Sequence, residues 1–228
     1  MLATTSQLET VAALREQLQA PAAPSQPVFY RGLDGLISGG VRRGSLIECL
    51  SEGGSGAVAL SLVIAQAACQ AGQALVVIDR SRRFYPPAAT PLGVDSETIL
   101  VRPQNRQDEL WALHQSLRCP GVGAVVCWPN KLDGRLFRAL QLAAESSGAV
   151  GLLVQPISVR GHPSWSDVQL VIEALPTGGK RRRLRVDVVR CRSGQQGSAV
   201  VELDDESGAL HVVTELAAPA GRPRTSRA

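Results

Sequence analysis

The stretch GSLIECLSEGGSGAVALSLVIAQAACQAGQALVVID, residues Gly44–Asp79, decides the fold. An apolar run at Leu46–Leu50 leads into a glycine-rich turn, a helical segment at Gly56–Ala71 follows, and a second apolar run lies at Ala74–Ile78. Strand, turn, helix and strand in this order form a βαβ unit. The turn stands where a phosphate-binding loop would stand, which raises the question of whether it binds a nucleotide.

Two more apolar runs of strand length, Gly123–Cys127 and Val150–Val154, alternate with helical segments at Gln107–Leu117 and Asp133–Ser147. The runs are nearly continuous, which is typical of parallel strands covered on both faces. After Pro163 the pattern predicts strands without helices, and we expect the sheet to continue antiparallel there, through Val168–Leu175, Arg182–Cys191, Ala199–Leu203 and Leu210–Thr214. The sequence therefore predicts an α/β fold with a doubly wound, mainly parallel sheet and antiparallel C-terminal strands.

The two ends of the chain differ from this body. Apolar residues recur at helical spacing within Ser6–Ala20, which predicts an amphipathic helix bearing Leu8, Val11, Leu14 and Leu18 on one side. The Pro/Ala-rich segment Pro21–Pro27 cannot continue a helix and is expected to be an extended tether. We therefore expect a helix and tether at residues 1–27, a folded core at 28–216 and a disordered basic tail at 217–228.

The composition is that of a soluble globular protein. The 228 residues suit one domain, 44% are hydrophobic and 19% charged, and mean hydropathy is +0.04. No segment is apolar enough to span a bilayer and no secretory signal is present, so we expect a cytoplasmic location. The five cysteines are widely spaced without a CxxC pair, and the three histidines show no ligand spacing, so we predict neither a disulfide framework nor a metal site.

The glycine-rich turn lacks the side chains of a working phosphate loop. The pattern G-x-x-x-x-G-K-[ST] supplies backbone amides for phosphate, a lysine to offset its charge and a hydroxyl to ligate magnesium. Here Ser51 replaces the first glycine, Gly56 is kept, and Ala57 and Val58 replace the lysine and the hydroxyl residue. We interpret the turn as a degenerate phosphate loop that joins strand to helix, with no cofactor expected.

Longer stretches resemble the RecA recombinases. The segment GLDGLISGGVRRGSLIECLSEGGSG is similar to the RecA passage that runs through a GG-x-x-x-G turn into the first core strand and the Walker loop. Leu75–Gln104 is similar to the RecA segment that carries the catalytic glutamate and the LGVD motif, and the likeness covers about Tyr30–Gln155. Together with the basic strands beyond Lys180, these features resemble the ImuA family, RecA-like accessory proteins of bacterial damage-inducible mutagenesis cassettes.

The resemblance also exposes departures. Where the RecA pattern has a catalytic glutamate after the second strand, this chain has Ser81. Where the Walker B strand should end in a magnesium-holding aspartate, it has Trp128. With Ala57 and Val58, four parts of one ATPase are absent while the scaffold pattern persists, so we expect no ATPase activity.

A function follows from this resemblance as an expectation. It implies a non-catalytic accessory factor in translesion DNA synthesis, with an ImuB-type Y-family polymerase homologue and an error-prone DnaE-type polymerase as partners. Two alternatives stay open: a cell-division inhibitor of the SulA type that binds FtsZ, since SulA also resembles a RecA domain without ATPase parts, and an active ATPase with an unconventional loop.

The positive charge of the chain is uneven although its net charge is only +4. The segment GGKRRRLRVDVVRCR carries one acid, Asp187, among its basic residues, of which the DNA- or partner-binding candidates are Lys180, Arg181, Arg182, Arg183 and Arg185, with Arg190 and Arg192 beyond them. Alternation within this strand places Leu184, Val186 and Val188 inward. The outward face either contacts phosphates or an acidic partner, or is a solvated face that protects a sheet edge.

Other residues carry weaker hypotheses. Arg80, Arg82 and Arg83 follow the strand Ala74–Ile78, where open α/β sheets place a ligand crevice, but surface charges are the favoured interpretation. The tryptophans are expected in a core or an interface rather than in catalysis, at Trp111, Trp128 and Trp165.

Overall fold

The structure, a computed structural model, describes residues 27–28, 36–37, 40–69, 72–92, 94–95, 98–192, 194 and 196–216. The predicted helix Ser6–Ala20 and the predicted tail 217–228 lie outside these residues. Within them, no helix combines the length and the apolarity needed to cross a bilayer.

One nine-stranded sheet organises the chain, in the order β11-β10-β9-β8-β3-β7-β6-β4-β5. The strands are β3 (Leu46–Ser51), β4 (Ala74–Ile78), β5 (Ile99–Val101), β6 (Val122–Cys127), β7 (Val150–Pro156), β8 (Val168–Leu175), β9 (Arg182–Cys191), β10 (Gly197–Leu203) and β11 (Leu210–Leu216). A separate two-residue pair joins β1 (Pro27–Val28) to β2 (Val41–Arg42). The predicted α/β fold with a mainly parallel sheet and antiparallel C-terminal strands is confirmed.

One expectation about the sheet is wrong in detail. β8 pairs parallel with β3, and the antiparallel part begins only at β9. The connection between β7 and β8 holds a 3₁₀ turn, η2 (Ile157–Val159), and no α-helix in the described chain. Because parallel crossovers usually contain a helix, a connection without one favoured an antiparallel strand. The chain instead returns past β3, where the Asp167 backbone amide donates to the Leu46 carbonyl.

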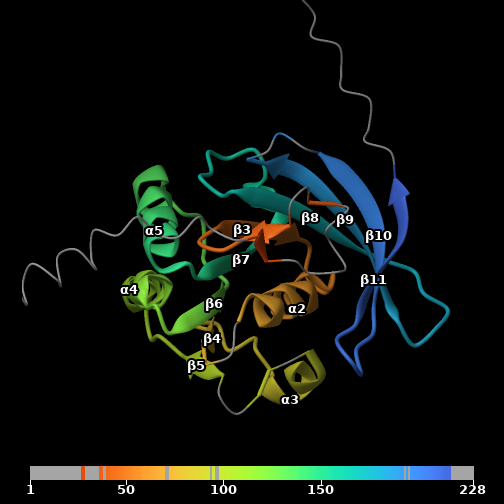
Figure 1. Cartoon of the computed structure of the whole chain (residues 1–228), viewed down its shortest axis with the longest axis horizontal. Helices are drawn as coiled ribbons and strands as arrows, with labels where there is room; N and C mark the ends of the chain where they lie inside the picture. The colour runs from red at the N-terminus through yellow and green to blue at the C-terminus, as the bar shows by residue number, and fades with distance from the viewer. Residues whose placement is uncertain are drawn as a thin grey trace, which may run out of the picture.

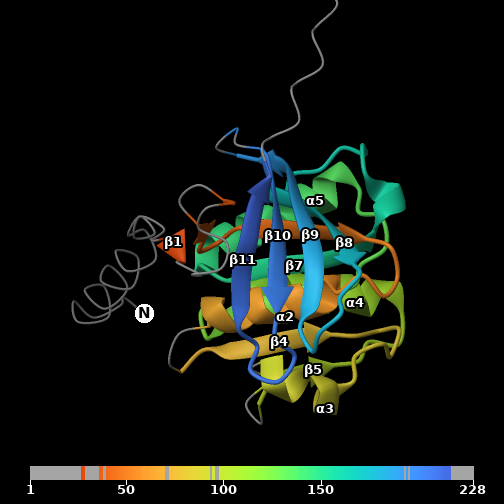
Figure 2. The same ribbon diagram turned by 90° about the vertical axis from the view of Figure 1, so that its right-hand side faces the viewer.

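Helices cover both faces of the parallel strands. The helices are α2 (Ala57–Ala68), the short α3 (Pro86–Ala89) with the 3₁₀ turn η1 (Thr90–Leu92), α4 (Arg106–Arg118) and α5 (Gly134–Ser147). Figures 1 and 2 show α2 on the side toward which β9, β10 and β11 curl, and α4 with α5 on the other side. The core is divided accordingly, since Leu60 and Ile64 pack with Leu184 and Val186, whereas Leu113 and Leu140 pack in a second cluster.

Candidate functional site

The glycine-rich turn joins β3 to α2 through glycine residues with left-handed backbone. β3 ends at Ser51 and α2 begins at Ala57, and between them Gly54 and Gly56 adopt left-handed φ values of 80° and 84°. Gly56 is the N-cap of α2 and offers no side chain to the helix, while its carbonyl accepts from the Leu60 amide at 3.0 Å. Left-handed backbone of this kind favours glycine, so the local sequence explains the turn without invoking a ligand.

Side chains of β9 pack against this turn. A Cβ atom at Gly56 would lie 2.7 Å from Leu184 Cδ2 and 3.1 Å from Arg182 Cδ. Ala57 is only 3% exposed, and Ser55 is buried with no hydrogen-bond partner for its hydroxyl in the described part of the chain. Glycine at position 56 is therefore required by packing as well as by backbone conformation. That packing gives the turn a structural role in this fold.

Aromatic side chains meet at the carboxyl ends of β4 and β6. After β4, the buried Asp79 carboxylate accepts from the Arg83 and Phe84 amides at 2.9 and 2.8 Å, which folds the chain back. The Phe84 ring then lies 6.3 Å from the Trp128 ring, centroid to centroid. Ser81 is exposed on the same loop. Ser81 and Trp128, which the resemblance matches to a catalytic glutamate and a metal-holding aspartate, are thus a surface hydroxyl and a packed aromatic ring.

The described residues offer no cluster of three or more His, Cys, Asp or Glu side chains that could hold a metal ion. Among the cysteines, Cys119 is exposed, and Cys49 and Cys127 are buried. Burial raises the pKa of the Cys49 thiol to about 12 and also raises the pKa of the Cys127 thiol. A thiol with a raised pKa is a poor nucleophile at neutral pH, so these two are structural.

The arginines after β4 are used differently from one another. Arg82 and Arg83 are exposed, as expected of surface charges. Arg80 instead donates through Nε to Glu109 Oε2 at 3.0 Å, and the Glu109 side chain is 2% exposed on α4. A buried carboxylate needs such a partner, so Arg80 holds the loop to α4.

The basic strand face is paired with acids of neighbouring strands and of the β10–β11 hairpin. Its ion pairs are Arg183 with Glu202 (3.5 Å), Arg185 with Glu173 (3.2 Å), Arg182 with Asp205 (2.9 Å), and Arg181 with Glu202 (3.8 Å) and Asp204 (3.7 Å). The antiparallel register sets Arg183 opposite Glu202 on β10 and Arg185 opposite Glu173 on β8. Among the described residues, Lys180 has no carboxylate within ion-pair distance. Leu184, Val186 and Val188 point inward, as predicted.

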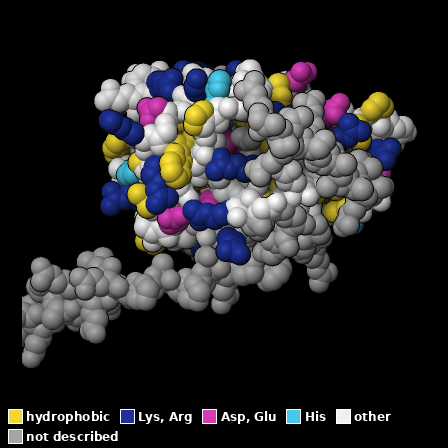
Figure 3. All heavy atoms as spheres, turned by 90° about the horizontal axis from the view of Figure 1, so that it is seen from above, with side chains coloured by type: hydrophobic (Ala, Val, Ile, Leu, Met, Phe, Trp, Pro, Cys, Tyr) yellow, Lys and Arg dark blue, Asp and Glu magenta, His cyan; other side chains and the backbone are white. Residues whose placement is uncertain are grey.

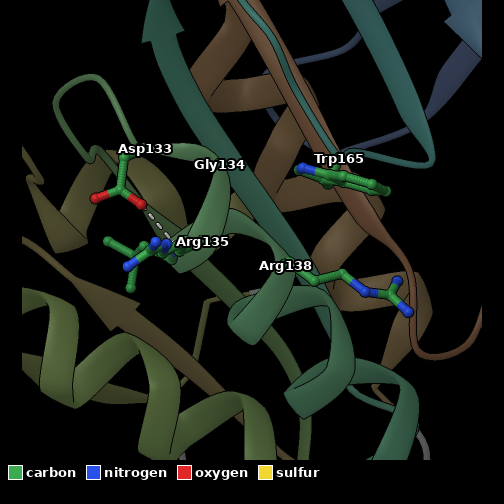
Figure 4. Close-up of a pocket in the computed structure, with 6 residues that line it drawn as sticks. Asp133, Gly134, Arg135, Arg138 and Trp165 are labelled. Carbon is green, nitrogen blue, oxygen red and sulfur yellow. Dashed lines mark hydrogen bonds between the residues drawn. The ribbon is translucent and has the colours of Figure 1, made fainter.

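The surface around Trp165 was not singled out from the sequence as a site, because the sequence predicted only a core or interface position for this tryptophan. Trp165, in the β7–β8 connection, is 49% exposed and lies beside the first turn of α5. The Arg138 guanidinium stands 5.7 Å from the Trp165 ring centroid (Figure 4). The sequence signal was weak, because one tryptophan and two arginines, Arg135 and Arg138, lie on segments far apart in the chain.

The sheet order, the phosphate-type turn between β3 and α2 and the antiparallel extension define a RecA-like fold. A solved structure, that of the RadB recombinase, superposes with a TM-score of 0.64 and 16% identity, covering 83% of this chain and 100% of that one. Protein RecA of Synechocystis is 30% identical over 95 residues, which is 41% of this chain and 27% of that protein. No protein-family model matches.

Two further relatives point to a narrower class. Protein ImuA from two strains of Caulobacter vibrioides is 27% identical over 168 residues, which is 64% of this chain and 68% of each relative. The resemblance stated from the sequence is thereby confirmed: the chain is similar to protein ImuA and has a RecA-like fold.

Proposed function

We propose that this chain is a non-catalytic, RecA-like accessory factor in DNA-damage-induced mutagenesis. It links a Y-family polymerase homologue of the ImuB type to an error-prone DnaE-type polymerase, so that DNA synthesis crosses a damaged template during the SOS response. The similarity to ImuA and RecA supports an accessory role in the mutagenesis cassette. The proposal goes beyond this accessory role when it assigns to the chain the link between the two polymerases.

The packing of β9 on the glycine-rich turn is the observation that supports a non-catalytic role. Leu184 and Arg182 hold Gly56 in place, so the turn persists for structural reasons while Ala57 supplies no ammonium group for phosphate. By the resemblance to RecA, Trp128 stands at the position of the magnesium-holding aspartate, and its ring lies 6.3 Å from the Phe84 ring. A scaffold that keeps its packing without these groups is suited to binding other proteins.

Calorimetry tests the non-catalytic part. Titration of the protein with ATP and magnesium should release no binding heat, because charge neutralisation and metal ligation are both missing. The double variant Ala57→Lys/Val58→Thr should also fail to release phosphate, since Ser81 cannot activate water. A micromolar binding signal that disappears when Gly56 is altered would overturn this part of the proposal.

Co-purification tests the linking part. The tagged chain is mixed with the two purified polymerases, and FtsZ serves as the alternative partner. We expect the polymerases to elute together only when the chain is present. Retention of FtsZ without either polymerase would instead favour a division inhibitor.

A further inference from the structure

An open groove lies between the start of α5 and the end of the β7–β8 connection. Its lining residues are Asp133, Gly134, Arg135, Leu136, Arg138 and Trp165. Figure 4 shows the Trp165 ring above α5 with the Arg138 side chain extending beside it. The Asp133 side chain is the N-cap of α5 and accepts from the Leu136 amide at 2.9 Å, so the cap fixes where α5 and the groove begin.

Trp165 is held in its exposed position by a buried carboxylate. Its two neighbours, Ser164 and Ser166, both donate their hydroxyls to Glu48 Oε2, at 2.6 and 2.8 Å, and Gln169 Nε2 donates to the same atom at 3.0 Å. Glu48 lies on β3 and is 3% exposed. A large aromatic side chain fixed at the surface by a buried polar network is preorganised for contact, which lowers the entropy cost of binding.

Several basic side chains near the groove have no ion-pair partner among the described residues. Arg135 and Arg138 line it, Arg190 Nη1 donates to the Ser164 carbonyl, and Arg106 Nη2 donates to the Lys131 carbonyl just before α5. None of these cations lies within ion-pair distance of a carboxylate in the described part of the chain. Figure 3, which looks onto the end of the molecule that carries the β7–β8 connection in Figure 1, shows basic side chains interspersed with hydrophobic ones.

The groove also has an apolar component. Leu136 and the Trp165 ring line it, and Leu142, four residues after Arg138 on the same face of α5, is 49% exposed. The Arg138 guanidinium covers one face of the Trp165 ring, which leaves less of that ring for stacking with a base. Exposed aliphatic side chains add nothing to phosphate binding, but they suit a partner with an apolar anchor.

We propose that this Trp165–α5 groove docks an acidic segment of a protein partner, with a large apolar side chain of that segment against Trp165 and its carboxylates on Arg135 and Arg138. Arg138 Nη1 donates to Gln141 Oε1 at 2.7 Å, but neither Arg135 nor Arg138 has an ion-pair partner among the described residues. The charge complementarity is between these guanidinium groups and carboxylates, which arginine can bind through two parallel hydrogen bonds. The proposal deepens the proposed linking function, on which it rests, by naming the surface and the chemistry of one partner contact.

Fluorescence anisotropy with synthetic probes tests the groove. The probes are a labelled amphipathic peptide with Glu on one helical face and Leu and Phe on the other, its counterpart with Lys for Glu, its counterpart with Ala for Leu and Phe, and an oligo-dT strand. We expect the acidic, apolar peptide to bind most tightly. Arg135→Glu/Arg138→Glu and Trp165→Ala should each weaken that binding by about tenfold or more.

Matched variants control for folding and net charge. Arg102→Glu/Arg118→Glu makes the same charge change at exposed sites, and Trp111→Ala removes a tryptophan that is 66% exposed on α4. Both should bind the peptide as the parent does, with unchanged circular dichroism. The proposal is overturned if the acidic peptide fails to bind, or if oligo-dT binds and the groove variants abolish that binding, which would make the groove a nucleic-acid site.

The polymerase mixing experiment separates this proposal from the proposed function. If the groove variants still join both polymerases as the parent does, the groove contact is wrong and the linking function stands. If the peptide binds the groove but neither polymerase is retained by the chain, the linking function is wrong and the groove contact stands.

Discussion

The basic strand β9 and the Trp165–α5 groove carry similar residues and present them differently. Four arginines lie close together in the sequence at the start of β9, yet each of them meets a carboxylate on a neighbouring strand or hairpin: Arg181, Arg182, Arg183 and Arg185. Around the groove the cations come from separate elements, and the described residues provide them with no carboxylate partner at ion-pair distance. The density of positive charge along a chain therefore does not measure the charge that a surface has free for a ligand.

The largest expected loss of stability comes from replacing Glu48, the buried carboxylate that binds the two neighbours of Trp165. Glu48→Ala leaves the hydroxyls of Ser164 and Ser166 and the amide of Gln169 without their acceptor. We expect a decrease of about 2–4 kcal/mol in the free energy of unfolding, because buried donors would be unsatisfied. Glu202→Ala, which removes an acid from the basic strand face, should cost about 0–1 kcal/mol, since its partners are half-exposed.

Urea denaturation of the two variants makes this measurement directly. If Glu48→Ala cost no more than Glu202→Ala, Trp165 would not be anchored by Glu48, and the contrast between a fixed groove and a solvated strand face would fail.

The fold was predictable to the level of elements because its strands are unusually apolar. Two strands were predicted with the bounds that the structure gives. Ala74–Ile78 was predicted from a continuous run of apolar residues, and Arg182–Cys191 from the alternation of apolar and polar residues. The short strand β5 was missed because three residues carry too little pattern. The parallel pairing of β8 was missed because pairing partners are chosen by tertiary packing, which a local pattern does not contain.

A smaller difference in stability is expected between alanine variants of two glycines in the glycine-rich turn. This difference measures how tightly β9 packs against the turn. Gly54 and Gly56 share left-handed backbone, but a Cβ at Gly54 would meet nothing within 4 Å, whereas one at Gly56 would lie 2.7 Å from Leu184 Cδ2. Gly54→Ala should cost about 1 kcal/mol from strain, and Gly56→Ala about 1–3 kcal/mol more from overpacking against β9.

Thermal denaturation of these variants, with Gly56→Ala repeated in a Leu184→Ala background, isolates the contact. The extra cost at position 56 should shrink in that background, because the clashing side chain has been removed. An equal cost for both glycines would mean that β9 does not hold the turn.

The candidate sites were less predictable than the fold. The sequence predicts replacement of the ATPase residues by Ala57, Val58, Ser81 and Trp128, because each follows a recognisable strand or turn, and this stays a prediction. The ion pairs of the basic strand could not be predicted from the sequence, because Glu202 becomes a neighbour of Arg183 only through the strand register. The groove has the same limitation, because Trp165 and Arg138 meet through the return of the chain past β3.

The smallest effect concerns DNA binding by the basic strand face. Any contact there should be weak, insensitive to sequence and strongly dependent on salt, because guanidinium groups on a strand bind phosphates without reading bases. Replacing Arg181, Arg183 and Arg185 by glutamate should lower affinity for all sequences alike. It should also flatten the slope of log affinity against log salt by about one unit for every phosphate that the variant no longer neutralises.

Removing an acid from these ion pairs should instead raise the affinity for DNA. Glu202 is shared by Arg181 and Arg183, at 3.8 and 3.5 Å, so a phosphate must displace it from both. Glu202→Gln keeps the shape of the side chain and frees Arg183, while Arg181 keeps its ion pair with Asp204 at 3.7 Å. We expect this variant to raise affinity for oligo-dT by about two- to fivefold at low salt, an effect within the range of about 0–1 kcal/mol for exposed ion pairs. Anisotropy titrations over a salt series measure both variants. If the charge-reversed protein bound DNA as well as the parent but no longer retained its polymerase-like partner, β9 would be a protein interface, and both basic regions of the molecule would serve protein contacts.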